Sequence, residues 1–409
     1  MVNIARFSLV GDDTGLRHQV DQSAENKMRI SIISPRYTLT GVALAQVRFA
    51  AALAQRGHDV ELVFGCLDPA HLPPDRCEPP VIPGVKVRVW GKGRVLGMFL
   101  PICRYLSSRR PDIVFSAEDH LNDVVLLAAI ATRSRAMISG SSHVLPVNAV
   151  GHDGPYSTSM LSPKWFFKQL TRALMWRADA MTCVCEDLVG EYRKLFGKCP
   201  HVCVTNVVID EAARESMAEP VDHEWFSHAD PPLIIAAGTL TKRKGFTDLI
   251  RAVRHLIDRG RPVRLAILGE GPMRRELEAL VRELGLENCV WLAGRVENPF
   301  KYFAKSQVFV LSSYAEGLGM VLVEAMMCGC VPVAADCPTG PREILQDGKY
   351  GYLVPMHDPA AMATGIEMAL DRPIPPEQLA EAVKSYEGEA VVRRHFETLG
   401  LSDASRPGE

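Results

Sequence analysis

The stretch VFVLSSYAEGLGMVLVEAMMCGCVPVAA, residues 308–335, has the pattern of a strand, a glycine-containing turn, a helix and a second strand. Short apolar runs bounded by turn residues are typical of strands that are buried on both faces of a parallel sheet. Two carboxylates interrupt this apolar pattern, Glu316 in the turn and Glu324 within the helix. Burying a charge is costly unless it is paired, so both groups are expected to have binding partners.

The same alternation of strands and helices extends along the chain. We expect further strands at residues 29–34, 61–64, 112–116, 136–139, 180–184, 201–205, 233–238 and 264–269. A charged segment with little periodicity, residues 210–232, separates them into two series. The pattern predicts two doubly wound, Rossmann-like α/β domains that face each other across a cleft, where ligands bind at the strand ends.

The length of the chain, 409 residues, also indicates more than one domain, because single hydrophobic cores stop growing well below this size. We divide the chain into an N-terminal tail (1–27), an N-terminal domain (28–209), a linker (210–232), a C-terminal domain (233–375) and a final segment (376–409). The final segment is expected to place a helix back on the N-terminal domain.

Composition excludes several classes of protein. The net charge of −2 gives no general attraction to nucleic acid. Eleven cysteines without a Cys-x-x-Cys pair indicate a reducing compartment and no structural zinc. No apolar run approaches the roughly 20 residues that span a bilayer, and the first 27 residues do not resemble a secretory leader. We expect a cytoplasmic protein.

The turn around Glu316 has the features of a diphosphate site. Gly317 and Gly319 allow the backbone to approach a ligand, and the helix that follows directs its free N–H groups and positive dipole end toward the turn. Glu316 and Glu324 could then accept hydrogen bonds from hydroxyl groups at the two ends of one ligand. A nucleoside diphosphate sugar has this chemistry. Alternatively, Glu316 is solvated and Glu324 is paired within the chain.

The segment EGLGMVLVEAMMCGCVPVAADCPTGPREIL, residues 316–345, resembles the Glu-x(7)-Glu signature of the retaining glycosyltransferases of family four, which have the GT-B fold. Further segments match in the family's order, among them RISIISPRYTLTG (29–41) and GTLTKRKG (238–245). The resemblance covers about residues 28–355. It implies a bacterial surface-polysaccharide enzyme that moves a UDP-linked sugar to a glycan or lipid-linked acceptor, with the acceptor on the N-terminal domain and the donor on the C-terminal domain.

The resemblance also implies roles for particular residues. Glu316 and His143 would lie at the donor sugar, Lys244 would neutralise the leaving diphosphate, and Glu324 would bind the ribose. The other expected donor-binding residues are Gly317, Leu318, Gly319, Arg243, Gly41, Gly271, Arg295 and Val296. Thr239 stands where the family has an arginine, so either Arg243 provides the second positive charge or the leaving group is less stabilised.

No metal or other cofactor is expected. The chain contains no Asp-x-Asp motif to hold a divalent cation at the diphosphate, so the helix N-terminus and Lys244 would provide the positive charge. Two rival functions share the predicted fold. One is a GT-B nucleotide-sugar epimerase, and the other is a non-catalytic nucleotide-sugar-binding protein, for which Thr239 is the support.

Two basic segments indicate contact with an anionic membrane. Residues 79–111 hold seven Lys and Arg residues and no acid. In PKWFFKQLTRALMWR (163–177), the residues Lys164, Lys168 and Arg172 recur at helical spacing beside Trp165. Basic and aromatic side chains together suit a membrane surface, where a lipid-linked acceptor would be met. Alternatively, the aromatic residues are core and the bases form a solvated helix face.

Overall fold

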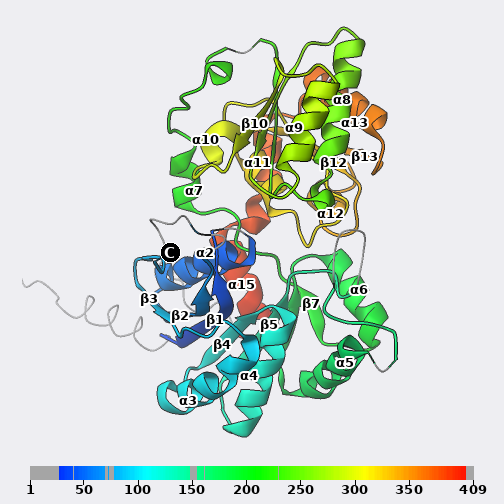
Figure 1. Ribbon diagram of the computed structural model, residues 1–409. Helices are drawn as coiled ribbons and strands as arrows, with labels where there is room; N and C mark the ends of the chain where they lie inside the picture. Colours follow the sequence, from blue (N-terminus) through cyan, green and yellow to red (C-terminus); the bar gives the residue numbers. More distant parts are fainter. Residues whose placement is uncertain are drawn as a thin grey trace, which may run out of the picture.

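The computed structural model describes residues 27–39, 41–69, 72, 78–147, 154–160, 162–228 and 230–401. The expected N-terminal tail, residues 1–27, lies outside these ranges except for Lys27. The described chain forms two α/β units, and Figure 1 shows the C-terminal unit above the N-terminal one.

The N-terminal sheet has seven parallel strands in the order β3-β2-β1-β4-β5-β6-β7. The strands are β1 (Arg29–Tyr37), β2 (Asp59–Leu67), β3 (Val85–Val89), β4 (Ile113–Ala117), β5 (Met137–Ser142), β6 (Ala180–Cys183) and β7 (His201–Cys203). The chain enters at the centre of the sheet and builds outward in both directions, which is the order of a doubly wound fold.

Helices cover both faces of this sheet. They are α2 (Gly41–Gln55), α3 (Phe99–Arg109), α4 (Asp119–Ala131), α5 (Pro163–Leu174) and α6 (Glu186–Phe196). Ile32 of β1 packs in one apolar cluster with Phe49 of α2, whereas Ile33 packs in another with Ile102 of α3 and Val125 of α4. Successive residues of the strand therefore pack into the apolar clusters on opposite faces of the sheet, which explains why the strand is continuously apolar.

The C-terminal sheet has six parallel strands in the order β10-β9-β8-β11-β12-β13. They are β8 (Leu233–Ala237), β9 (Arg264–Leu268), β10 (Val290–Gly294), β11 (Val308–Leu311), β12 (Val331–Ala335) and β13 (Tyr352–Val354). The main helices are α8 (Phe246–Asp258), α9 (Arg274–Glu283), α11 (Met320–Met327) and α13 (Pro359–Asp371). The apolar residues of α8, α9 and α13 share one cluster and those of α11 belong to another, so this sheet is also covered on both faces. The predicted pair of Rossmann-like units is confirmed.

Short elements join the two units. The segment predicted as a linker, residues 210–232, contains α7 (Glu211–Ser216) and the 3-10 helix η4 (Glu224–Phe226). It packs on the C-terminal unit, since the His223 ring stacks on that of Trp291 at a centroid distance of 4.0 Å. Two short helices, α10 (Phe300–Phe303) and α12 (Pro341–Ile344), complete this unit.

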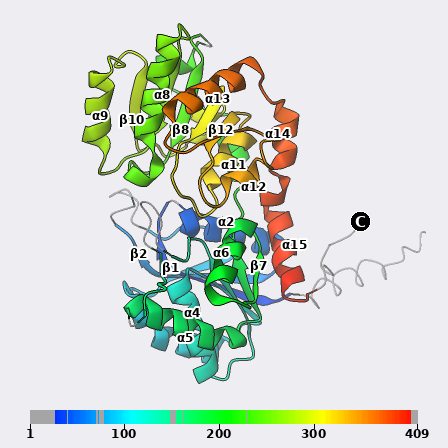
Figure 2. The same cartoon turned by 90° about the vertical axis from the view of Figure 1, so that its right-hand side faces the viewer.

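The last two helices connect the units a second time. α14 (Pro376–Ala382) packs beside α11, and α15 (Gly388–Thr398) packs on α2. Figure 2 shows this orange and red segment passing from the upper unit to the lower one. Phe396 of α15 is buried in the same apolar cluster as Phe49 of α2, so the end of the described chain contributes to the N-terminal core.

Candidate active site

The turn between β11 and α11 lies against the N-terminal domain. A Cβ atom on Gly317 would come within 1.9 Å of the carbonyl oxygen of His143, and the Cys185 thiol lies 3.2 Å from the Gly317 carbonyl oxygen. Gly319 caps α11 with a φ of 88°, which favours glycine. Glycine is thus needed at 317 because another backbone approaches it, a reason that the sequence pattern did not reveal.

Glu316 is buried in this turn between two cations. The Lys244 Nζ atom lies 2.6 Å from Oε1 of Glu316, and the Arg243 Nη1 atom lies 3.3 Å from Oε2. Burial alone would raise the pKa of Glu316, but Lys244 and Arg243 outweigh it and hold the pKa below its usual range. The alternative expectation of a solvated Glu316 is wrong. The site contains an ionised carboxylate that is already paired.

Both cations come from the loop after β8. Lys242–Lys244 form the 3-10 helix η5, and the next helix, α8, begins at Phe246. Arg243 Nη1 also donates to the Ala315 carbonyl oxygen at 2.7 Å, so its guanidinium is fixed on the turn. Thr239 is exposed and uncharged. The structure therefore places Arg243 beside Lys244, where it could act in place of the arginine that the family has at position 239.

Glu324 has a partner in the other domain. The Arg48 side chain of α2 is 5% exposed, and its Nη1 atom lies 3.0 Å from Oε1 of Glu324. The Arg48 Nε atom lies 3.4 Å from Oδ2 of Asp210, and its guanidinium lies over the Phe300 ring at 5.8 Å. Internal pairing, the alternative expectation for Glu324, is therefore what the structure shows. Arg48 was not among the expected site residues, although an arginine inside the apolar helical pattern of residues 41–55 was a signal.

His143 follows β5 and is buried at the edge of the turn. Its Nε2 atom lies 2.8 Å from the Ser141 hydroxyl oxygen. Burial lowers the pKa of His143 to about 4, so its ring is neutral at physiological pH. Its Nδ1 atom has no hydrogen-bond partner within the described ranges. His143 is thus a neutral ring beside the Glu316 turn, and its Nδ1 atom is buried without a hydrogen-bond partner among the described residues.

The other expected donor-binding residues lie at strand ends. Gly271 follows β9, and Arg295 and Val296 follow β10, on the same edge of the sheet as the Glu316 turn. Leu318 is buried within the turn. A Cβ on Gly271 would lie 2.6 Å from the Leu240 backbone, so packing alone requires this glycine. Gly41 begins α2 in the N-terminal domain with a φ of 60°.

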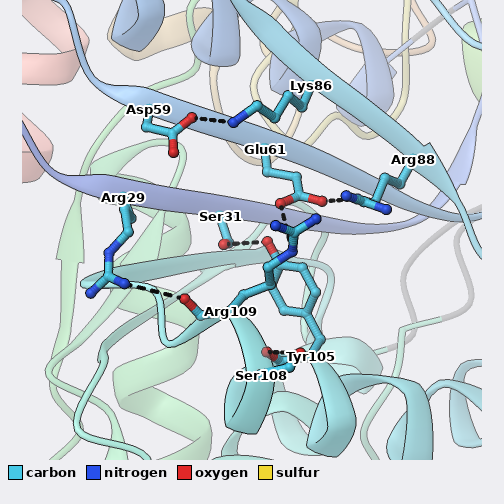
Figure 3. Close-up of polar contacts among 9 residues, drawn as sticks. All are labelled: Arg29, Ser31, Asp59, Glu61, Lys86, Arg88, Tyr105, Ser108 and Arg109. Atoms are coloured by element: carbon cyan, nitrogen blue, oxygen red, sulfur yellow. Dashed lines mark hydrogen bonds and ion pairs between the residues drawn. The ribbon is translucent and has the colours of Figure 1, made fainter.

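The two basic segments differ in their surroundings. In residues 79–111, Lys86 pairs with Asp59 at 2.8 Å, and Arg88 and Arg109 both pair with Glu61 of β2, as Figure 3 shows. These ion pairs connect the edge strand β3 and helix α3 to β2. Three of the seven bases in this segment are therefore paired within the domain.

Helix α5 presents a different face. Phe166 and Leu170 are 55% and 41% exposed, and Trp176, just beyond the helix, is 74% exposed. Lys168 and Arg172 form no ion pair with any described residue. Phe167, by contrast, stacks on Tyr156 at 5.3 Å and belongs to the core. Phe166 and Trp176 thus have the exposure that membrane contact requires, whereas Phe167 packs as the alternative expectation, a core residue, predicts.

The least buried of the predicted membrane residues is Arg172, whereas Lys164, Trp165 and Lys168 are half-buried. Within the described residues, no helix has the length and apolar character that a membrane span requires. Among the residues that the structure describes, no three or more His, Cys, Asp or Glu side chains are grouped so that they could hold a metal ion.

Two family profiles match the chain, one in each unit. The profile described as "Glycosyl transferase 4-like domain" matches residues 40–206, and the profile "Glycosyl transferases group 1" matches residues 220–386. The structure is similar to that of HepE from Anabaena, solved with UDP, with a TM-score of 0.71 and 18% identity over 91% of this chain and 100% of that chain. It is also similar to sucrose-phosphate synthase from Thermosynechococcus elongatus, with a TM-score of 0.64 and 20% identity over 91% of this chain and 96% of that chain.

Curated relatives match part of the chain. An uncharacterized glycosyltransferase from Methanocaldococcus jannaschii is 27% identical over 62% of this chain and 62% of its own length. A Campylobacter jejuni N-acetylgalactosamine-N,N'-diacetylbacillosaminyl-diphospho-undecaprenol 4-alpha-N-acetylgalactosaminyltransferase is 39% identical over 34% of this chain and 37% of its own length. The chain thus covers less than two thirds of either relative.

Two facing Rossmann-like sheets with a buried, cation-paired glutamate in the turn before α11 define a protein of the GT-B class. The chain belongs to the group 1 glycosyltransferases, whose N-terminal half is of the glycosyltransferase 4-like type. The family resemblance of the sequence is confirmed.

The interdomain pair gives the first prediction. Arg48→Met should lower the free energy of unfolding by about 3 kcal/mol, because it removes a buried guanidinium and leaves the partly buried Glu324 without a cation. When Glu324 is already changed to Gln, Arg48→Met should lower the free energy of unfolding by less. Chemical denaturation of the two single variants and the double variant should give a coupling energy of about 1–3 kcal/mol.

The matched control is Arg29→Met, whose pair with Asp112 at 3.1 Å is exposed on both sides. This change should cost less than about 1 kcal/mol. Strictly additive effects of Arg48→Met and Glu324→Gln would show that the two side chains do not stabilise each other.

Proposed function

We propose that this glycosyltransferase moves a sugar from a UDP-linked donor to a glycan or lipid-linked acceptor in the synthesis of a surface polysaccharide. Transfer retains the anomeric configuration and uses no metal. The observation that carries this proposal is the buried Glu316 with Lys244 and Arg243, at the N-terminal end of α11 and beside His143. The UDP in the HepE structure supports the donor class, and the diphospho-undecaprenol substrate in the Campylobacter enzyme's name supports the acceptor class.

In this proposal the C-terminal domain binds the donor. Glu316 accepts hydrogen bonds from the sugar hydroxyls, and Glu324 accepts them from the ribose while it keeps its contact with Arg48. The remaining donor contacts come from Gly317, Leu318, Gly319, Gly41, Gly271, Arg295 and Val296. The backbone N–H groups at the start of α11 face the diphosphate.

The positive charge of the site acts on the leaving group. Lys244 and Arg243 together carry two charges against one on Glu316, and the start of α11 adds about half a positive charge. The bond between the anomeric carbon and the diphosphate breaks as the acceptor oxygen attacks the same face of the sugar. A phosphate oxygen of the departing UDP takes the acceptor proton, so Glu316 need not be a nucleophile.

A transfer assay tests this function. The purified chain, given UDP-, GDP- and ADP-sugars and a panel of glycan and lipid-linked acceptors, should form product only from a UDP-sugar. NMR of the product should show the anomer of the donor, and excess chelator should leave turnover unchanged. An inverted anomer or loss of turnover with chelator would contradict the mechanism, and donor isomerisation without acceptor would identify an epimerase.

The two glutamates should respond differently to amide substitution. Glu324→Gln should mainly weaken donor binding, by about tenfold, because a neutral amide forms a weaker hydrogen bond to ribose. Glu316→Gln should mainly lower kcat, because it changes the charge balance around the leaving group. Thermal shift with UDP reports binding and the transfer assay reports rate. If both variants keep the affinity and rate of the parent, the two carboxylates are structural.

We also propose that the protein works in the cytoplasm, with the N-terminal domain at the inner face of the membrane. Phe166, Leu170 and Trp176 expose apolar surface around α5, next to Lys168 and Arg172. Leu96, which precedes α3, and Leu100, in its first turn, are also exposed. Exposed aromatic residues combined with bases favour the surface of an anionic bilayer, where a lipid-linked acceptor would reside.

Vesicle flotation tests this contact. The protein should float with phosphatidylglycerol vesicles and much less with phosphatidylcholine vesicles. The double change Lys168→Ala and Arg172→Ala should weaken binding about thirtyfold, at about 1 kcal/mol for each base. The matched control is Arg193→Ala with Lys194→Ala on α6, which removes the same charge elsewhere in the domain. Equal losses in both variants, or no binding to either vesicle, would refute the membrane contact.

A further inference from the structure

Glu118 occupies an unfavourable backbone conformation at the end of β4. It is the residue between β4 and α4, and its φ of 82° and ψ of 133° are disfavoured for any residue with a side chain. Glycine would adopt this conformation without strain. A glutamate therefore stands where glycine would be the more stable choice, which indicates that its side chain has a use.

The surroundings explain the backbone strain. Glu118 N–H donates to the Ser141 carbonyl oxygen at 3.0 Å, and the Glu118 carbonyl oxygen accepts from Leu121 N–H, also at 3.0 Å. The next residue, Asp119, is buried and accepts hydrogen bonds from Ser142 at 2.8 Å and from Tyr192 at 2.9 Å. The chain must turn sharply so that Asp119 can reach this network. Glu118 takes no part in this network and is exposed.

The Glu118 carboxylate has no structural task in the described chain. It does not cap α4, and it forms no hydrogen bond or ion pair with any residue that the structure describes. The side chain is exposed to solvent, yet the protein atoms around it raise its pKa to about 7, against the attraction of Arg36. An exposed carboxylate without a hydrogen bond or ion pair to any described residue can accept a hydrogen bond from a ligand.

Glu118 is connected to the candidate active site. Ser141, whose carbonyl binds the Glu118 backbone, also contacts the His143 ring through its hydroxyl at 2.8 Å. His143 in turn touches Gly317 of the donor turn. Because β4 and β5 are neighbours, Glu118 and His143 lie at the same edge of the N-terminal sheet. In the proposed function this end of the sheet lies beside the donor turn, because the His143 backbone approaches Gly317.

We propose that Glu118 is a positioning residue that binds the acceptor sugar by accepting a hydrogen bond from one of its hydroxyl groups. This inference rests on the proposed function and names the N-terminal contact of the acceptor. A hydroxyl fits better than a cationic group, because Arg36 at the end of β1 acts electrostatically on Glu118 and would repel a cation. The hydroxyl keeps its proton until the leaving phosphate takes it.

The test separates acceptor binding from donor binding. In an assay at about pH 8, where a Glu118 carboxyl with a pKa of about 7 is mostly ionised, Glu118→Gln should raise the acceptor KM about tenfold, because a charged acceptor of hydrogen bonds is replaced by a neutral one. The donor KM and the slow hydrolysis of donor by water should change less than about twofold, since neither involves the acceptor sugar. Glu118→Gly should raise the acceptor KM at least as much, while its Tm should increase because the backbone strain is relieved.

A helix-capping role would give other results. Loss of a favourable negative charge at the start of α4 would lower the Tm of both variants and change donor and acceptor constants together. Glu191→Gln on α6, a surface change in the same domain, is the control and should leave every constant unchanged. If the parent transfers sugar but Glu118→Gln keeps its acceptor KM, this inference is wrong. If the parent transfers no sugar to any acceptor, the proposed function has failed instead.

Discussion

The rest of the site depends on one constraint, the placement of two carboxylates where the two domains meet, Glu316 buried and Glu324 partly buried. Each needs a cation nearby, and the chain meets this need in two ways. Glu316 is paired with Lys244 and Arg243 of its own domain, whereas Glu324 is paired with Arg48 from the N-terminal domain. The first pairing sets the charge of the turn. The second joins the domains, so a ligand that binds Glu324 also acts on the packing between them.

The interior of the fold could be predicted from the sequence because both sheets are buried on both faces. Runs such as residues 308–311 and 331–335 are apolar throughout, which separates them from their surroundings. Strands β3, β10 and β13 escaped prediction, and all three are edge strands. β3 alternates Val with Lys86 and Arg88, whose partners lie on β2. In the sequence alone, Lys86 and Arg88 make this strand look like a basic surface segment, because their acidic partners on β2 lie 27 residues away.

The site could be predicted only in part, because its partners come from distant parts of the chain. Glu316, Lys244 and Arg243 were selected from motifs, and the structure brings all three together. Arg48 lies 276 residues from Glu324, and no local pattern connects them. Glu118 was missed for a related reason. Its unusual feature is a backbone angle, and that angle follows from a network around Asp119 that only the folded chain assembles.

The charge balance of the turn bears on the missing family arginine at Thr239. Before any ligand binds, Arg243 and Lys244 exceed Glu316 by one positive charge, and the N-terminal end of α11 adds to that excess. Arg243 is held by the Ala315 carbonyl as well as by Glu316, so little side-chain freedom is left to lose when an anion binds. A positive charge that is fixed in advance stabilises a developing diphosphate without reorganisation. In the proposed function, Arg243 would therefore do the electrostatic work that the family resemblance assigns to an arginine at position 239.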